Sequence, residues 1–207
     1  NSIQWLINGL IIQTQAQALT SDANEYLARA TVLSDGAIRE WSVIGPFDDD
    51  DCRGMEVSYG PEEDSNQALT WPCKNGTVSW QQVSTLDGTA PYIDLSNIFN
   101  DINEVVAYAQ SHVYCPTAMA AKLVYSTSQS GVGWVNGTEV FRDEISAGLL
   151  LEEGTVNVNF QQGWNTVLIK SLNHWGLEWS LHASLLDDNA QPLINIPGVI
   201  ISAERAD

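Results

Sequence analysis

The first 12 residues of the chain contain a run of apolar residues whose spacing fits two different secondary structures. The spacing of three and four residues that is typical of a helix is met by Ile3, Leu6, Ile7, Leu10 and Ile11. The alternation that is typical of a strand is met by Ile3, Trp5, Ile7 and Ile11. Both conformations therefore stay open for this apolar arm, residues 1–19. In either one the arm is exposed unless it docks on its own domain or on a neighbouring subunit, where Trp5 is the expected anchor.

A short helix is predicted directly after the arm. Asp22 can cap its first turn, and the pair Asp35-Gly36 is a typical helix end. One apolar stripe runs between these two signals and consists of Ala23, Tyr26, Leu27, Ala30 and Leu33. The helix thus connects the arm to the following domain, so we divide the chain into an arm and helix (residues 1–36) and a domain (residues 37–207).

From residue 38 onward, short apolar runs alternate with turn residues. The predicted strands cover residues 38–44, 78–83, 91–95, 104–114, 121–127, 132–135, 138–141, 155–160, 165–172, 177–186 and 192–201. The turns between them include Asp87-Gly88, Asn136-Gly137, Gly154 and Gly163. Many short strands without intervening helices predict an all-β sandwich or barrel.

Several aromatic and glycine-containing segments occur in a fixed order between residues 38 and 190. They are 41–48 (WSVIGPFD), Pro61-Glu62, Trp80, 106–109 (VAYA), 133–137 (GWVNG), 163–170 (GWNTVLIK) and Trp179. This order resembles the galactose-binding-like β-jelly-roll domains that accompany many secreted bacterial enzymes and surface proteins. The resemblance implies a jelly-roll β-sandwich that binds carbohydrate through loops at one end or through one sheet face, often with a structural calcium ion. The loop 126–133 departs from the better-known binders because it carries no charged residue.

Composition narrows the range of partners. The chain has 207 residues, of which 44% are hydrophobic, and this is enough for one sizeable domain with its own core. Only 8 residues are Lys or Arg against 26 Asp or Glu, so the formal net charge is -18. Such a surface repels nucleic acid and anionic lipid, and the arm is too short to span a bilayer. The many uncharged polar residues are typical of an extracellular protein that packs against itself or carries glycans, although an acidic soluble protein also fits.

Cysteines and sequons point to an extracellular protein as well. Cys52 and Cys73 bracket a loop and are predicted to form a disulfide, which leaves one of the three cysteines over. Asn75 and Asn136 each begin an Asn-Gly-Thr sequon for glycosylation, but Asn-Gly is also a common turn. No zinc motif is recognised, because the chain has no C-x-x-C pair and its histidines are dispersed.

Two loops carry candidate binding residues. The acidic run 48–51, with Glu56 close by, supplies carboxylates that suit calcium, and Asp48, Asp50 and Glu56 are the candidate ligands. A solvated acidic loop explains the same run. In the segment 173–175, the indole of Trp175 can stack on a sugar ring if it is exposed, with His174 and Asn173 as polar neighbours. A tryptophan packed within the loop is the alternative.

Catalytic motifs are missing from the sequence. It contains no G-x-S-x-G, H-E-x-x-H or P-loop motif, and neither carboxylates nor histidines show a paired spacing. We therefore expect a protein without enzymatic activity.

Two non-catalytic functions fit these features. The apolar arm favours an extracellular structural subunit that docks residues 1–19 into the next copy, and such head-to-tail contacts build a surface filament when they do not close a ring. The resemblance favours the alternative, a carbohydrate-binding module of a secreted or cell-surface protein. The partners are copies of the chain itself in the first case and surface glycans in the second. Because the leading arm is so apolar, we favour the first function, the structural subunit.

Overall fold

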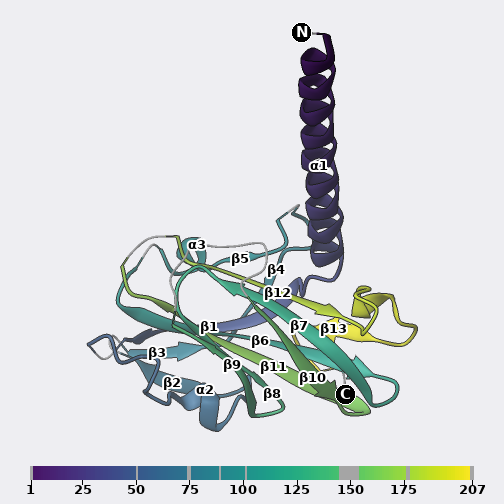
Figure 1. Ribbon diagram of the computed structural model, residues 1–207. Coiled ribbons are helices and arrows are strands. Elements are labelled where there is room, and N and C mark those ends of the chain that lie inside the picture. The colour runs from purple at the N-terminus through teal and green to yellow at the C-terminus, as the bar shows by residue number, and fades with distance from the viewer. Residues whose placement is uncertain are drawn as a thin grey trace.

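The protein consists of a long N-terminal helix and a β-sandwich (Figure 1). The computed structural model describes residues 2–49, 51–73, 76–88, 90–100, 102–144, 154–175 and 178–205, and of residues 2–16 it describes the backbone alone. The sandwich is built from antiparallel sheets, which confirms the all-β class expected from the short, closely spaced strands.

The larger sheet has seven strands in the order β4-β1-β6-β11-β8-β9, with β13 paired to β6. Their bounds are β1 (Glu40–Asp48), β4 (Gln81–Ser84), β6 (Val105–Cys115), β8 (Gly131–Val135), β9 (Thr138–Asp143), β11 (Gly163–Asn173) and β13 (Ile200–Ser202). The two longest strands, β6 and β11, pair along their whole length at the centre of this sheet. Strand β1 lies on the other side of β6, so β1 and β11 run in the same direction and end at the same edge.

The smaller sheet has four strands in the order β10-β7-β12-β5. Their bounds are β5 (Ile93–Asp94), β7 (Met119–Thr127), β10 (Gly154–Phe160) and β12 (Ser180–Leu186). The remaining elements are a hairpin and three short helical segments, namely β2 (Thr70–Cys73), β3 (Gly76–Ser79), α2 (Gly60–Glu63), α3 (Leu95–Phe99) and η1 (Leu193–Asn195).

Apolar side chains form a layer on each face of the larger sheet. The main core lies between the two sheets and includes Trp41, Ala107, Leu123, Val167, Trp179 and Leu181. A second cluster covers the opposite face and includes Phe47, Val106, Tyr108 and Leu168, packed against Tyr59, Trp71 and Trp80. Because successive residues of a strand face opposite sides, β6 and β11 are buried on both faces wherever the segment 51–80 lies over them. Each fully buried large side chain contributes about 1.5–3 kcal/mol.

Helix α1 (Ser2–Asp35) is one continuous helix that extends away from the sandwich (Figure 1). The helical interpretation of the arm is therefore confirmed, while Asp22 lies inside the helix and does not cap it. Leu33 is fully buried against Val124 and Leu186, whereas Leu19 is 71% exposed. The side chains of the predicted docking residues lie outside the described part of the structure; these are Ile3, Trp5, Leu6, Ile7, Leu10 and Ile11.

Most predicted strands are present, and the exceptions have local reasons. The predicted strand 78–83 is interrupted at Trp80 and contributes to both β3 and β4. The predicted strand 192–201 is wrong over most of its length, because a 3₁₀ turn precedes the short β13. Strand β2 was not among the predicted strands, and Pro72 within it lacks the N–H group of a regular strand residue. Among the described residues, no helix is long and apolar enough to cross a membrane.

Candidate functional site

The two loops that carry the predicted binding residues meet where strands β1 and β11 of the larger sheet end. Asp48 ends β1 and Asn173 ends β11, and both are paired with Val105 of the central strand β6. The residues that follow them, Asp49 and His174, therefore leave the sheet side by side. The Nδ1 atom of His174 lies 2.6 Å from Oδ2 of Asp49 and forms an ion pair or hydrogen bond with it.

Asp49 is the buried carboxylate of this site, with 1% of its surface exposed. Its second oxygen, Oδ1, accepts a hydrogen bond of 3.0 Å from the backbone N–H of Gly54. A Cβ atom at position 54 would lie 2.2 Å from this oxygen, so glycine is required for the close approach. Burial raises the pKa of Asp49, and the neighbouring His174 opposes that rise.

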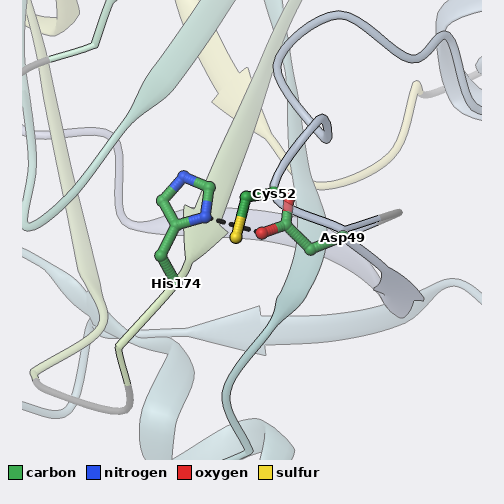
Figure 2. Close-up of side chains that lie close together, drawn as sticks. All are labelled: Asp49, Cys52 and His174. Carbon is green, nitrogen blue, oxygen red and sulfur yellow. Dashed lines mark hydrogen bonds and ion pairs between the residues drawn. The ribbon is translucent and has the colours of Figure 1, made fainter.

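Cys52 completes a cluster of three side chains that can ligate a metal. One donor atom from each of Asp49, Cys52 and His174 lies within 4.8 Å of the other two. Figure 2 shows the sulfur of Cys52 beside the contact between Asp49 and Nδ1, while Nε2 of the imidazole points away from both. In a catalytic triad the nucleophile and the carboxylate occupy opposite ring nitrogens. The arrangement therefore differs from a triad and presents N, O and S donors to one point.

A buried amide network holds His174 in place. The backbone N–H of His174 donates to Oε1 of Gln129 at 2.8 Å, and Nε2 of Gln129 donates to Oδ1 of Asn173 at 2.7 Å. The side-chain nitrogen of Asn173 in turn donates to the carbonyl of Ile102 at 2.8 Å. Asn173 is completely buried, so the expectation that it contacts a glycan is corrected. It positions the loop because both ends of its amide are used inside the protein.

Trp175 is 63% exposed, and its ring centroid lies 5.5 Å from that of His174. An exposed indole in this loop is what sugar stacking requires, and contact with a glycan stays a prediction for both residues.

The expected calcium ligands do not gather in the structure. Glu56 is exposed and Asp48 is half-buried, while Asp50 lies outside the described residues. Within the described part of the chain, the group of three ligating side chains that does form contains Asp49, which was not among the expected ligands. Calcium binding by Asp48, Asp50 and Glu56 stays a prediction.

The predicted disulfide is absent, because Cys52, Cys73 and Cys115 are all free thiols. Cys73 is held in the β2–β3 hairpin opposite Gly76, while Cys52 lies in the turn beside Asp49 and His174. The two thiols therefore lie in different local structures, one in a hairpin and the other in the turn that follows β1.

Asn136 occupies the two-residue turn between β8 and β9, as its Asn-Gly sequence predicts. Its φ angle is 51°, and its side chain bonds to Asn165 and to the backbone of Thr166. Glycosylation of Asn136 stays a prediction, and Asn75 lies outside the described residues.

A groove crosses the outer face of the larger sheet beside the segment 51–80. It consists of two adjoining pockets of about 500 and 430 Å³ that share Ser65 and Arg205. The first is lined mainly by polar side chains, including Gln67, Gln110, His112 and Arg205. The second contains Trp134, Leu168, Pro61 and Thr166. The groove therefore has a polar surface in its first pocket and a half-buried indole in its second.

Hydrogen bonds fix the orientation of the polar groups in the groove. Nη2 of Arg205 donates to Oγ1 of Thr166 at 2.6 Å, and its Nε donates to Nδ1 of His112 at 3.4 Å. Gln67 donates to Oε1 of Gln110 at 2.9 Å. Burial, and secondarily the charge of Arg205, lowers the pKa of His112 to about 4, so this imidazole is neutral at neutral pH.

The sequence analysis missed the groove, although the strands carried a signal for it. Gln110 and His112 occupy alternate positions of β6, and Thr166 lies on the same face of the neighbouring strand β11. Polar residues on one face of otherwise apolar strands indicate a face that the core does not cover.

A buried ion pair fixes the segment 51–80 to the sheet between the groove and the Asp49 cluster. Nζ of Lys170 lies 2.7 Å from Oε1 of Glu62 and donates to the carbonyl of Val57 at 2.7 Å. The Tyr108 hydroxyl donates to the same carboxylate oxygen at 2.5 Å. Burial lowers the pKa of Lys170, and Glu62 opposes this effect. Glu62 also lines the second pocket, so the ion pair supports one wall of the groove.

No family model and no curated protein matches the chain. Among solved structures, it is similar to a β-glucosidase from Kluyveromyces marxianus, with 12% identity over 40% of this chain and 11% of that one and a TM-score of 0.33. It is also similar to a family 35 carbohydrate-binding module from Clostridium thermocellum, with 19% identity, 40% and 69% coverage and a TM-score of 0.29.

Proposed function

We propose that this chain is a non-catalytic carbohydrate-binding module and that the groove on the outer face of the larger sheet holds the glycan. The observation that carries the proposal is the pair of adjoining pockets of about 500 and 430 Å³, in which the amide of Gln67 and the guanidinium of Arg205 line the same groove as the indole of Trp134. The buried side chains of Gln110 and His112 bond within the protein and orient these groups. A sugar offers hydroxyl groups that both donate and accept hydrogen bonds, together with an apolar ring face. The groove supplies partners for both kinds of surface.

The charge distribution favours a neutral glycan. The whole chain carries a net charge of -18, which repels acidic polysaccharides at long range. Inside the groove, Gln67 and Gln110 are uncharged, and His112 is neutral above a pKa of about 4. Arg205 is then the cation that lines the groove, and four carboxylates line it as well, Asp64 and Glu204 in the first pocket and Glu62 and Glu63 in the second. We therefore expect glycan affinity to change little between pH 5.5 and 8.

Replacement of Arg205 tests this proposal. Arg205 is exposed and its guanidinium orders Thr166 and His112, so Arg205→Ala is expected to weaken binding at least 10-fold without unfolding the domain. The measurement is a screen of the intact protein against neutral oligosaccharides, followed by calorimetry on the best ligand. Arg142→Ala removes another exposed arginine, on β9, and is the matched control. Binding to no member of the panel, or full binding by Arg205→Ala, contradicts the proposal.

Helix α1 supports a second candidate function, self-association. Tyr26 and Leu27 are both 61% exposed and Leu19 is 71% exposed. Large apolar residues recur every seven positions at Trp5, Ile12, Leu19 and Tyr26, and the next of the series, Leu33, is buried against the chain's own domain. Small residues recur with the same period at Gly9, Ala16, Ala23 and Ala30. This four-three spacing is typical of coiled coils, and residues 1–21 carry no charge that would repel a second copy. We propose that α1 pairs with α1 of another copy.

The oligomeric state of the full chain tests helix pairing. The double substitution Leu19→Asp with Tyr26→Asp is expected to give monomers in light scattering, where the unaltered chain gives dimers. Gln17→Asp places one charge on the same helix outside the seven-residue seam and is expected to leave the dimer intact. A monomeric unaltered chain at high concentration would refute this function. Closed pairing yields dimers, so the filament that we expected from the sequence needs a second contact and stays a prediction.

A further inference from the structure

We propose that Asp49, Cys52 and His174 form a binding site for a divalent transition metal, with Zn²⁺ as the ion that fits best. This site lies at the edge where β1 and β11 end, and it is independent of the proposed glycan groove. The sequence gives no zinc signature, because His174 is far from the other two residues along the chain.

The donor atoms are close to the separation that a bound metal requires. Zn²⁺ binds nitrogen and oxygen at about 2.0–2.2 Å and sulfur at about 2.3 Å, so ligand atoms in a tetrahedral site lie about 3.3–3.7 Å apart. The three donor atoms here lie within 4.8 Å of one another, and the Nδ1–Oδ2 distance is 2.6 Å. Small side-chain rotations therefore suffice to admit the ion. Figure 2 shows that all three side chains already point towards one place.

The type of donor selects the metal. A thiolate, an imidazole nitrogen and a carboxylate oxygen together suit Zn²⁺ or a related transition ion, whereas calcium prefers oxygen alone. Binding replaces the proton shared by Asp49 and His174 and removes the thiol proton of Cys52. The metal therefore restores charge balance to a carboxylate that is 1% exposed.

The surrounding residues hold the ligands as an outer shell does in metal proteins. Gly54 donates its N–H to Oδ1 of Asp49, which leaves Oδ2 directed at the cluster. Gln129 accepts the backbone N–H of His174 and fixes that residue at the end of a central strand. Cys52 is exposed, so solvent reaches the cluster at this thiol. The site is thus open to a water molecule or to an external ligand, as catalytic and ligand-binding zinc sites are.

Cobalt substitution tests the site directly. The full chain is stripped with a chelator, kept reduced, and titrated with Co²⁺, whose thiolate complexes give an ultraviolet charge-transfer band and visible bands of tetrahedral geometry. We expect these bands at one equivalent and their loss when Zn²⁺ is added. Cys52→Ser is expected to abolish the charge-transfer band, and His174→Gln to weaken Zn²⁺ binding at least 10-fold in calorimetry.

Cys73→Ser is the matched control because it removes a thiol outside the cluster, so it should keep both the band and the affinity. Zn²⁺ should also raise the unfolding temperature of the unaltered chain and of Cys73→Ser but not of Cys52→Ser. Since Cys52 is exposed, this variant is expected to fold. The absence of a thiolate band in the unaltered chain, or its persistence in Cys52→Ser, overturns the proposal. Both readouts use the metal alone, so they do not depend on glycan binding.

Discussion

The pKa values of individual side chains in this protein depend on neighbours that are distant in the sequence. His112 illustrates this, because its imidazole is 5% exposed, and its Nδ1 lies beside Arg205 and the hydroxyl of Thr166. Burial and the arginine charge make protonation unfavourable in the folded state, so the pKa falls to about 4 from an ordinary value of about 6.5. A histidine with such neighbours contributes to the pH dependence of folding.

The stability of the fold should fall as the pH drops from 6.5 to 4. In that range the unfolded chain protonates His112 and the folded chain does not, so the contribution is fully present above pH 6.5 and is lost towards pH 4. The full shift corresponds to about 3 kcal/mol. Urea unfolding across this range measures it, and His112→Gln should show a shallower decline than the unaltered chain. Parallel declines in the two proteins would mean that His112 is not the responsible group.

At the scale of elements, α1 is anchored by its last turn. Leu33 packs fully buried on Val124 and Leu186 of the smaller sheet, and Ser184 donates its hydroxyl to the carbonyl of Leu33 at 2.6 Å. Residues 17–28 are exposed. The helix is therefore fixed to the domain at one end, and the rest of its described surface is available to a partner.

Two alanine substitutions on α1 should differ strongly in their effect on stability. Leu33→Ala removes a buried side chain and leaves a cavity, so it is expected to lower the free energy of unfolding by about 2–4 kcal/mol. Leu19→Ala changes a side chain that is 71% exposed, and it should alter stability by less than about 0.5 kcal/mol. Denaturant unfolding of the monomer, at concentrations below self-association, compares the two. Equal effects would show that the free part of α1 also contributes to the fold.

At the scale of the whole molecule, the larger sheet carries two sites at different positions along one strand. The Asp49 cluster lies beside Val105 at the start of β6, and the groove lies around Gln110 and His112. From Val105 to Gln110 and His112 the extended strand spans about 17–23 Å. The ion pair of Lys170 and Glu62 lies between them.

The two sites should therefore act independently. Cys52→Ser is expected to leave glycan affinity within two-fold of the unaltered chain, and Arg205→Ala to leave the Co²⁺ spectrum unchanged, because Cys52 and Arg205 belong to sites that are several strand residues apart, and substitutions that far apart behave additively. Calorimetry and absorption spectroscopy on both variants and on the double variant check this. A loss of glycan binding in Cys52→Ser would instead place the metal cluster within the glycan site, near Trp175.

Local patterns predicted much of the sandwich and little of the sites. Alternating apolar runs identified the central strands, and Asn136-Gly137 identified the turn between β8 and β9. Trp175 was expected to be exposed on a loop if it bound sugar, and it is exposed. The expected pairing of Cys52 with Cys73 was wrong, because two cysteines that bracket a loop in the sequence need not have their thiols together in the fold.

By itself, the sequence determined the strand-rich domain, its principal turns and the end of the helix before it, since these depend on residue spacing and on glycine within a few positions. Only the tertiary structure decided that Asp49, Cys52 and His174 meet, and that Gln110, His112 and Arg205 line one groove. Both outcomes follow from the order β1-β6-β11 in the larger sheet. That order arises from hydrogen bonding between strands distant in sequence and from burial on both faces of β6, neither of which is encoded in local spacing.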